Sequence, residues 1–353
     1  MNQSVDISIV CACRNEAGHI EEFVRSILGQ DMGRMNWEAI VADGMSDDGT
    51  REILDRISAE DSRIRVLANR GRIVSTGLNA AIAASRGRII FRFDAHTSYS
   101  PDYCLRCVEA LERTGADNVG GPARTRAHGV KARAIAAAYH SRFSTGGARF
   151  HDPDFEGYVD TVPYGCWRRE VFEKIGDFDE TLVRNQDDEF NLRLLRAGGT
   201  IWQSPAIVSW YSPRKTIRAL FHQYFQYGFW KVAVVRKHRM PGSWRHLVPA
   251  GFVLAHIVLL LTLAVSAITG ASEVFVWTSA LWLTMTGVYI LGIVTASVVA
   301  ARKAGWDTLP YLPGAFGAFH VSYGLGFLAG LFRFAIEGEG KPSSNSVFAR
   351  ITR

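Results

Sequence analysis

The chain has 353 residues, of which 48% are hydrophobic and 21% charged, and its formal net charge is +6. This length allows two domains, or one domain with an appendage. Most charge lies before Arg245 and most of the later chain is apolar, which predicts a soluble domain followed by a membrane region. A moderate basic excess suits nucleic acid, anionic lipid or phosphorylated small molecules. No nucleic-acid motif or basic repeat is present, so nucleic acid is not an expected partner.

The cysteines argue against a disulfide framework, because they are few and odd in number. Cys104 and Cys107 form a C-x-x-C within a helical pattern, but no second pair and no histidine pair completes a zinc site. We expect ordinary core or surface thiols. The first residues, MNQSVDISIV, lack the basic start and long apolar core of a signal peptide. The first domain is therefore expected to stay in the cytoplasm.

Four apolar strands alternate with helices in the first third of the chain. Helices with apolar residues at helical spacing follow each strand, and Asp47 or Asp48 can cap the second helix. This βαβ series predicts an α/β fold with a mainly parallel, Rossmann-like sheet. The strands are expected at Ile7–Cys13, Trp37–Val41, Ile64–Leu67 and Arg88–Phe93, and the helices at 20–28, 53–57, Ser75–Ser85 and Pro101–Arg113.

The next part of the chain is less regular. It should contain a strand at Asn118–Pro122, a helix at Val130–Phe143 and a further element starting at Val171–Ile175. The Gly-, Asp- and Pro-rich stretch Ser144–Tyr158 predicts a flexible loop near the cleft. A short helix at Asp188–Ala197 should end at the following glycine pair.

Asp94 and His96 follow the fourth strand, in the stretch FRFDAHT. Ligands of open α/β sheets lie at the carboxyl ends of the strands. A carboxylate and an imidazole together suit a divalent ion such as Mn²⁺, and Mg²⁺ less well. The alternative is that Asp94 caps the next turn and His96 is solvated.

Two other acidic residues, Asp43 and Asp187, also follow the ends of predicted elements. Asp43 and Asp94 at one sheet edge would place a nucleotide site beside a metal site. Asp187 opens the cluster Asp187-Asp188-Glu189, where like-charge repulsion is expected to raise its pKa and make it a general base. The alternative is an acidic helix start that the helix dipole favours.

Residues 216–246 mix aromatic and basic side chains, which suits a helix at the membrane interface, although an aromatic core helix is the alternative. Leu247–Thr269 and Val274–Ala301 each exceed the ~20 residues needed to span a membrane. Arg302-Lys303 follows the second span, and the basic cluster 236–245 precedes the first, so both clusters are expected in the cytoplasm. A third stretch, Leu309–Leu331, could span or lie re-entrant.

Four stretches in order resemble an inverting family 2 glycosyltransferase with the GT-A fold. The strand and helix of ISIVCACRNEAGHIEEFVRSILGQ resemble the family's opening, and DGMSDDGT resembles its D-G-x-S-x-D-G-T. Asp94-Ala95-His96 stands where the family has D-x-D, and Gly165–Leu194 resembles the acceptor-side block. The D-A-H variant is similar to glucosyltransferases of succinoglycan-type exopolysaccharide assembly.

The resemblance implies roles for particular residues. Asp43 matches the acid that bonds the pyrimidine base, with Arg14 and Glu16 beside it; Asp94 matches the donor and metal acid, and His96 the metal acid. Asp187 matches the general base. Asp188, Gln223 and Tyr227 are implied on the acceptor side. Mg²⁺ or Mn²⁺ would neutralise the departing diphosphate.

The implied protein is an enzyme of the bacterial inner membrane, multi-pass, with its catalytic domain cytoplasmic. It would move one sugar, glucose from UDP-glucose, onto a lipid-linked (polyprenyl-diphosphate) saccharide in exopolysaccharide or other surface glycan synthesis. The stretch from Gln223 to Tyr227 lacks the Arg and Trp of the Q-x-x-R-W of processive synthases, which implies single addition. The expected domains are 1–215 (catalytic), 216–246 (interfacial), 247–335 (membrane, two or three helices) and 336–353 (tail).

Two other functions remain open from the sequence. A polyprenyl-phosphate sugar transferase uses a phosphate acceptor and needs little base catalysis. A non-catalytic scaffold that binds nucleotide would explain why His96 replaces a carboxylate.

Overall fold

The computed structural model describes residues 4–336. The chain divides into two compact units. Of the described residues, the first unit comprises 4–126 together with Arg149–Ser212, and the second comprises Ala127–Ala148 together with 213–336. The sequence had suggested one catalytic domain over 1–215, whereas this division groups the internal segment Ala127–Ala148 with the later helices. Each unit is described by itself below.

The first unit is built on a mixed sheet with strand order β3-β2-β1-β4-β8-β6-β9-β7, and β10 and β5 form a separate pair. Strands β8 and β7 run antiparallel to their neighbours and the other pairings in the large sheet are parallel, so the predicted mainly parallel sheet is confirmed. The strands are β1 (Ile7–Cys13), β2 (Trp37–Asp43), β3 (Ile64–Ala68), β4 (Ile89–Phe93), β5 (Thr97–Tyr99), β6 (Asn118–Gly120), β7 (Gly157–Tyr158), β8 (Cys166–Arg168), β9 (Ile201–Gln203) and β10 (Ser209–Tyr211).

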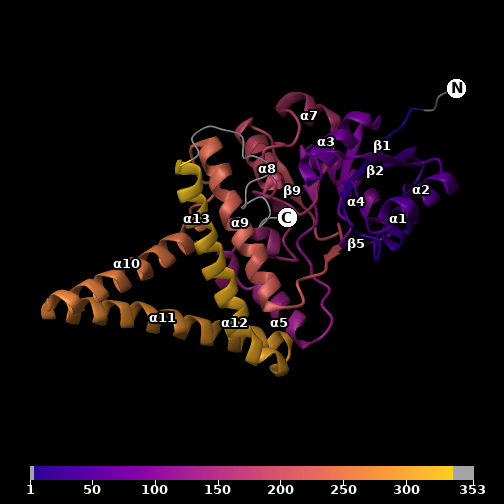
Figure 1. The fold of residues 1–353 in the computed structure, drawn as a ribbon. Helices are drawn as coiled ribbons and strands as arrows, with labels where there is room; N and C mark the ends of the chain where they lie inside the picture. Colours follow the sequence, from indigo (N-terminus) through magenta and orange to yellow (C-terminus); the bar gives the residue numbers. More distant parts are fainter. Residues whose placement is uncertain (1–3, 337–353) are drawn as a thin grey trace. The chain divides into compact units, whose positions relative to one another are not determined.

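Helices cover both faces of this sheet (Figure 1). One core packs α1, α2 and α4 against one face, and a second core packs α3, α7 and α8 against the other. In β1, Ile9 and Val10 belong to opposite cores, which explains why the strand sequence is apolar at almost every position. The helical elements of this unit are α1 (Ile20–Leu28), α2 (Thr50–Glu60), α3 (Val74–Ala84), α4 (Tyr103–Thr114), η1 (Arg149–His151), α7 (Arg169–Ile175) and α8 (Gln186–Arg196).

Local details refine the sequence expectations. Gly49 is the N-cap of α2, and Asp48 supports the helix start by accepting a 3.1 Å hydrogen bond from the Thr50 amide. The stretch 144–158, expected as a loop, includes the short elements η1 and β7. The five cysteines are free and buried, as core thiols.

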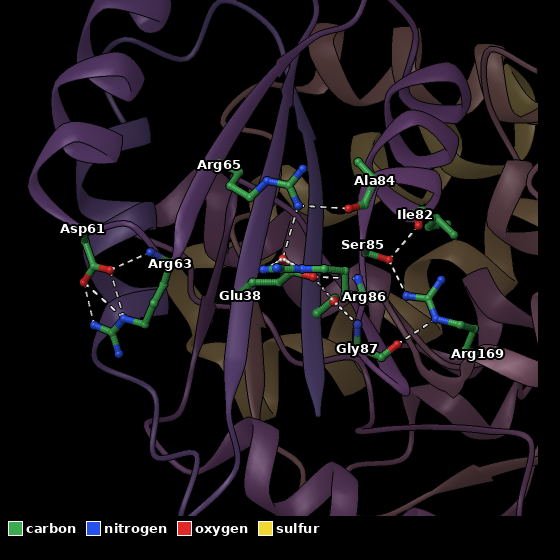
Figure 2. A network of polar contacts seen from close by, with 11 residues as sticks. Glu38, Asp61, Arg63, Arg65, Ile82, Ala84, Ser85, Arg86, Gly87 and Arg169 are labelled. Carbon is green, nitrogen blue, oxygen red and sulfur yellow. Dashed lines mark hydrogen bonds and ion pairs between the residues drawn. The ribbon is translucent and has the colours of Figure 1, made fainter. Parts of the chain in front are cut away.

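A buried glutamate network closes the sheet edge where β1 and β2 begin (Figure 2). The Glu38 side chain is 3% exposed; its Oε1 accepts from Ser8 Oγ at 2.9 Å and from the Arg86 amide at 2.7 Å. Its Oε2 lies 2.9 Å from Arg86 Nη2 and 3.3 Å from Arg65 Nη1. Structural ion pairs therefore occupy the end of the sheet where these strands begin. The candidate site lies at the other end, where the strands finish.

The second unit is helical. Three of its helical stretches are long and apolar enough to cross a membrane: Trp244–Thr269, Ser272–Ala304 and Trp306–Ala335. Half of the most apolar window of the third is buried inside the structure, against 11% for each of the others. The elements are α5 (Val130–Tyr139), α6 (Arg142–Thr145), α9 (Ile217–His238), η2 (Trp244–His246), α10 (Val248–Thr269), α11 (Ser272–Ala304), η3 (Trp306–Tyr311), α12 (Leu312–Gly317), the π-helical turn η4 (Ala318–Ser322) and α13 (Tyr323–Ile336).

Helices α9 and α13 lie side by side, while α10 and α11 form a hairpin that extends away from them (Figure 1). Close approach of α9 and α13 depends on small residues, because a Cβ on Gly228 would come within 2.1 Å of the Tyr323 carbonyl and one on Gly326 within 2.0 Å of the Phe225 carbonyl. Phe229 and Trp230 of α9 are buried. Part of the aromatic face predicted at the interface is therefore packed against protein.

The segment Ala127–Ala148 is built into this unit. Predicted as one helix to Phe143, it forms α5 and α6, which His140 and Ser141 separate. Ala134, Ile135 and Ala138 of α5 are buried in a core shared with residues of α11 and α12. Arg133 forms an ion pair with Asp307.

Candidate functional site

The site residues gather where β2, β1 and β4 end side by side. Cys13 of β1 pairs with Asp43 of β2, and Cys11 pairs with Phe93 of β4, so Asp43 and Asp94 flank the end of β1. Neighbouring strands lie ~4.8 Å apart, which puts these two backbone positions roughly 10 Å from each other. Two of the three predicted acidic positions therefore share this edge.

The loop after β1 brings Glu16 to His96. Glu16 Oε1 lies 2.8 Å from His96 Nε2, and the Glu16 side chain is 12% exposed while that of His96 is 52% exposed. The Glu16 amide donates to Thr50 Oγ1 at 2.7 Å, which ties this loop to the start of α2. Glu16 thus links the loop after β1 to the loop after β4 and to the start of α2. These pairings were not evident from the sequence.

Asp43 is 3% exposed and is engaged with its own loop. Its Oδ1 accepts from Ser46 Oγ at 2.5 Å and from the Ser46 amide at 3.2 Å. Gly44 allows Arg14 to pack on this loop, because a Cβ on Gly44 would come within 3.0 Å of Arg14 Cβ. Asp43 therefore shapes the loop beside Arg14, and contact with a base would require its Ser46 bonds to be shared.

The donor set at Asp94 fits a cation that is shared with a ligand. Asp94 Oδ1 accepts from the His96 amide at 3.0 Å, and the Tyr99 hydroxyl accepts from the Asp94 amide at 2.8 Å, so this turn is held firmly. Across residues 4–336 no group of three or more His, Cys, Asp or Glu side chains forms a metal cluster. Mg²⁺ is typically held by one or two carboxylates plus substrate phosphates. Asp94 suits that arrangement, and His96 is directed at Glu16.

Asp187 lies in the first turn of α8, after Asn185 in the left-handed conformation at φ 61°. Its Oδ2 is 3.2 Å from Arg92 Nη1, and its Oδ1 accepts from the Asp188 amide at 2.9 Å. Partial burial acts to raise the pKa of Asp187, whose side chain is 47% exposed, but the Arg92 charge and these hydrogen bonds outweigh it and lower the pKa below its ordinary value.

The expectation that acidic neighbours raise the pKa of Asp187 is therefore wrong. Glu189 is fully buried and is paired with Arg193 at 2.9 Å, so its charge is neutralised on another side of the helix. Asp188 acts through its backbone amide, which favours the ionised form of Asp187.

The sequence analysis did not single out Arg92, which the structure places 3.2 Å from Asp187. The signal was present, because a charged residue stands in the otherwise apolar strand IIFRF, two positions before Asp94. Residues two apart in a strand share one face of the sheet.

Backbone strain also concentrates at this edge. Within residues 4–336, six non-glycine residues have positive φ, and five of them lie in loops at the carboxyl ends of the parallel strands or beside Asp187: Asn15, Met45, Arg72, Tyr164 and Asn185. Such conformations persist where the surrounding structure over-determines them, and they are common at active sites.

The acceptor-side residues are divided between the two units. Asp188 lies beside Asp187 in the first unit, whereas Gln223 and Tyr227 lie on α9 in the second. Gln223 Nε2 donates to the Tyr227 hydroxyl at 3.1 Å. Their predicted role stays a prediction.

Known proteins resemble this chain along most of its length. Residues 8–176 match the family described as glycosyl transferase family 2. The succinoglycan biosynthesis protein ExoA of Rhizobium meliloti is 34% identical over 274 residues, which are 77% of this chain and 82% of that protein.

A more distant relative from Methanococcus voltae is 24% identical over 93% of this chain and 97% of its own length. It is named a dolichyl N-acetyl-alpha-D-glucosaminyl phosphate 3-beta-D-2,3-diacetamido-2,3-dideoxy-beta-D-glucuronosyltransferase. Among solved structures, a mannosyltransferase from Pyrobaculum calidifontis in complex with GDP-Man and Mn²⁺ matches with a TM-score of 0.56 at 17% identity. The match covers 91% of this chain and 88% of that one, which shows that the fold is shared.

Proposed function

The chain belongs to glycosyl transferase family 2, and from this premise we propose that it moves a single sugar from a nucleotide-diphospho-sugar onto a lipid-linked saccharide at a bacterial inner membrane. UDP-glucose is the first donor to test. The similarity to a succinoglycan biosynthesis protein supports an exopolysaccharide product. The exposed apolar helices α10 and α11 support attachment to the membrane.

The observation that supports catalysis most directly is the position of the Asp187 carboxylate, 3.2 Å from Arg92 of β4. In the proposed reaction Asp187 takes the proton of an acceptor hydroxyl while that oxygen attacks the anomeric carbon. The bond from this carbon to the diphosphate oxygen breaks on the opposite face, so the configuration inverts and the nucleoside diphosphate leaves. Oδ1 of Asp187 accepts a backbone hydrogen bond and Oδ2 faces the Arg92 charge, which favours a fixed direction of proton transfer.

On the donor side, Asp94 would hold a divalent cation together with the diphosphate, and Glu16 would keep His96 beside it. A bound Mg²⁺ or Mn²⁺ would neutralise charge on the leaving diphosphate. Arg14 and the loop that Asp43 shapes would border the base. The Pyrobaculum calidifontis complex contains Mn²⁺ and GDP-Man, so both metals and both UDP and GDP donors belong in the first screen.

The proposed membrane orientation follows the basic residues. Arg302 and Lys303 end α11, while the turn at Gly270 between α10 and α11 is followed by Glu273 and has no Lys or Arg. The positive-inside rule then favours a cytoplasmic catalytic unit. Whether the third apolar stretch spans fully is best asked by labelling cysteines introduced at its two ends.

The test uses the full-length protein in detergent, with a panel of nucleotide-sugars and a polyprenyl-diphosphate sugar as acceptor. Release of nucleoside diphosphate that depends on the acceptor is expected. Asp187→Asn should lower kcat by roughly 10²–10⁴ while donor affinity by calorimetry stays nearly unchanged. Asp188→Asn is the matched control and should have a much smaller effect.

Three outcomes would contradict parts of the proposal. Full activity of Asp187→Asn on a polyprenyl phosphate would favour a phosphate acceptor, which needs little base catalysis. Loss of donor binding in Asp187→Asn would make Asp187 a donor ligand. Absence of turnover with every donor and acceptor, together with retained nucleotide binding, would favour a non-catalytic scaffold.

A further inference from the structure

Arg92 is a buried cation near the carboxyl end of β4. It is 7% exposed in β4, where Phe91 and Phe93 on either side are at most 1% exposed. An isolated buried charge is strongly unfavourable, so such a group requires a partner of opposite charge. Among the described residues its ion-pair partner is Asp187, at 3.2 Å.

Two carboxylates, those of Asp187 and Asp94, act electrostatically on the Arg92 guanidinium. Burial acts to lower the pKa of Arg92, but attraction first to Asp187 and then to Asp94 outweighs it and raises the pKa. Asp94 belongs to the donor side of the proposed reaction and Asp187 to the acceptor side. Arg92 thus forms its ion pair with a carboxylate from a distant part of the sequence, and it stands two positions before Asp94.

The same contact sets the direction of the Asp187 carboxylate. Oδ2 faces Arg92 and Oδ1 faces the Asp188 amide, so rotation of the carboxylate would break one of these interactions. The ionised form of Asp187 is favoured by the Arg92 charge from β4 and by backbone amides of its own helix, while Glu189 is paired with Arg193. A free carboxylate on a helix start would have no such constraint.

We propose that Arg92 is a positioning residue: it orients the Asp187 carboxylate toward the acceptor hydroxyl and keeps it next to the donor-side turn at Asp94. The inference rests on the proposed function, in which Asp187 is the base. It also has a consequence for pH. Arg92 keeps Asp187 ionised into acidic solution, at the cost of some basicity.

The experiment compares Arg92→Met and Arg92→Lys in the full-length protein. Arg92→Met should lower kcat by roughly 10²-fold, as expected for a misplaced reacting group, with a smaller change in donor KM. The acidic limb of the kcat profile should move to higher pH by roughly 1–3 units, because the Arg92 charge that favours the ionised form of Asp187 is removed. Arg92→Lys keeps the charge and should recover part of kcat and most of the acidic limb.

Arg168 at the end of β8 provides a matched control, since its guanidinium donates to the carbonyls of Ala116 and Leu111. Arg168→Met should lower the melting temperature and leave the acidic limb in place. An unshifted acidic limb in Arg92→Met, or Arg92→Lys as impaired as Arg92→Met, would overturn the proposal and leave Arg92 as a structural residue.

A second readout does not depend on activity. Asp187→Asn leaves the Arg92 charge buried without its partner, so its melting temperature should fall, and adding Arg92→Met should restore part of that loss. If the melting temperature recovers but the unsubstituted protein transfers no sugar from any donor tested, the pair exists and the proposed function fails. Strictly additive melting temperatures would refute the pairing itself.

Discussion

Replacing Glu38 by Gln tests the ion-pair network that closes the sheet edge opposite the site (Figure 2). Gln keeps the shape of Glu38 but replaces one acceptor oxygen by an NH₂ group. This group is a donor and cannot accept the hydrogen bonds that Arg65, Arg86 or Ser8 donate. Hydrogen bonds to charged groups contribute about 1.5–3 kcal/mol each. The Arg86 and Arg65 side chains are 61% and 39% exposed, so solvent screens their pairing and each adds only about 0–1 kcal/mol.

We therefore expect a net loss of about 2 kcal/mol, which corresponds to a fall in melting temperature of about 4–8 °C for a unit of this size. The assay is thermal unfolding of the full-length protein in detergent at pH 7. The exposed Glu112 of α4 supplies the control, and Glu112→Gln should leave the melting temperature nearly unchanged.

The pH dependence provides a stricter test. Burial acts to raise the pKa of Glu38, but hydrogen bonds from Arg86 and Ser8 outweigh it and hold the pKa below its ordinary value. A depressed folded-state pKa contributes stability above the unfolded-state pKa, and this contribution is lost as the pH falls through the folded value. The gap in melting temperature should be full at pH 7 and shrink below about pH 4.3. Equal melting temperatures at pH 7, or a gap that persists in acid, would refute the reasoning.

Three further predictions concern the site and its support. Asp94→Ala should abolish transfer and weaken nucleotide-sugar binding, since Asp94 is the carboxylate proposed to share the cation; unchanged affinity by calorimetry with UDP and Mn²⁺ would count against this. His96→Asp should retain some activity and shift the preference toward Mg²⁺, a harder ion that favours oxygen, whereas identical metal profiles would argue that His96 does not approach the ion. Truncation after Trp210 removes the helices against which α5 packs, so size-exclusion chromatography should show aggregation and calorimetry a loss of UDP binding. A monodisperse fragment that binds UDP as the full chain does would contradict this.

The sequence alone was enough to predict the first four strands of the first unit and the helices that follow them, but not the short strands β5 and β7–β10. Apolar runs such as Ile7–Cys13 are local features, and a strand covered on both faces has few alternatives. The edge that holds Asp43 and Asp94 followed as well, because parallel strands end on the same side of a sheet. The apolar stretches that became α10 and α11 were equally visible, since length and composition alone decide whether a helix can cross a membrane.

Only the tertiary structure decided the partners of the charged side chains. The sequence places Asp187 beside Asp188 and Glu189, yet the charge that governs its pKa comes from Arg92 on a distant strand. Electrostatic interactions depend on distance in space and on burial, and the residues adjacent in the sequence determine neither. For the same reason Glu16 and His96 could be assigned to one site but not to each other. The segment Ala127–Ala148 joined the second unit because the alanine-rich face of α5 finds its apolar partners there, and such complementarity exists only once both surfaces have formed.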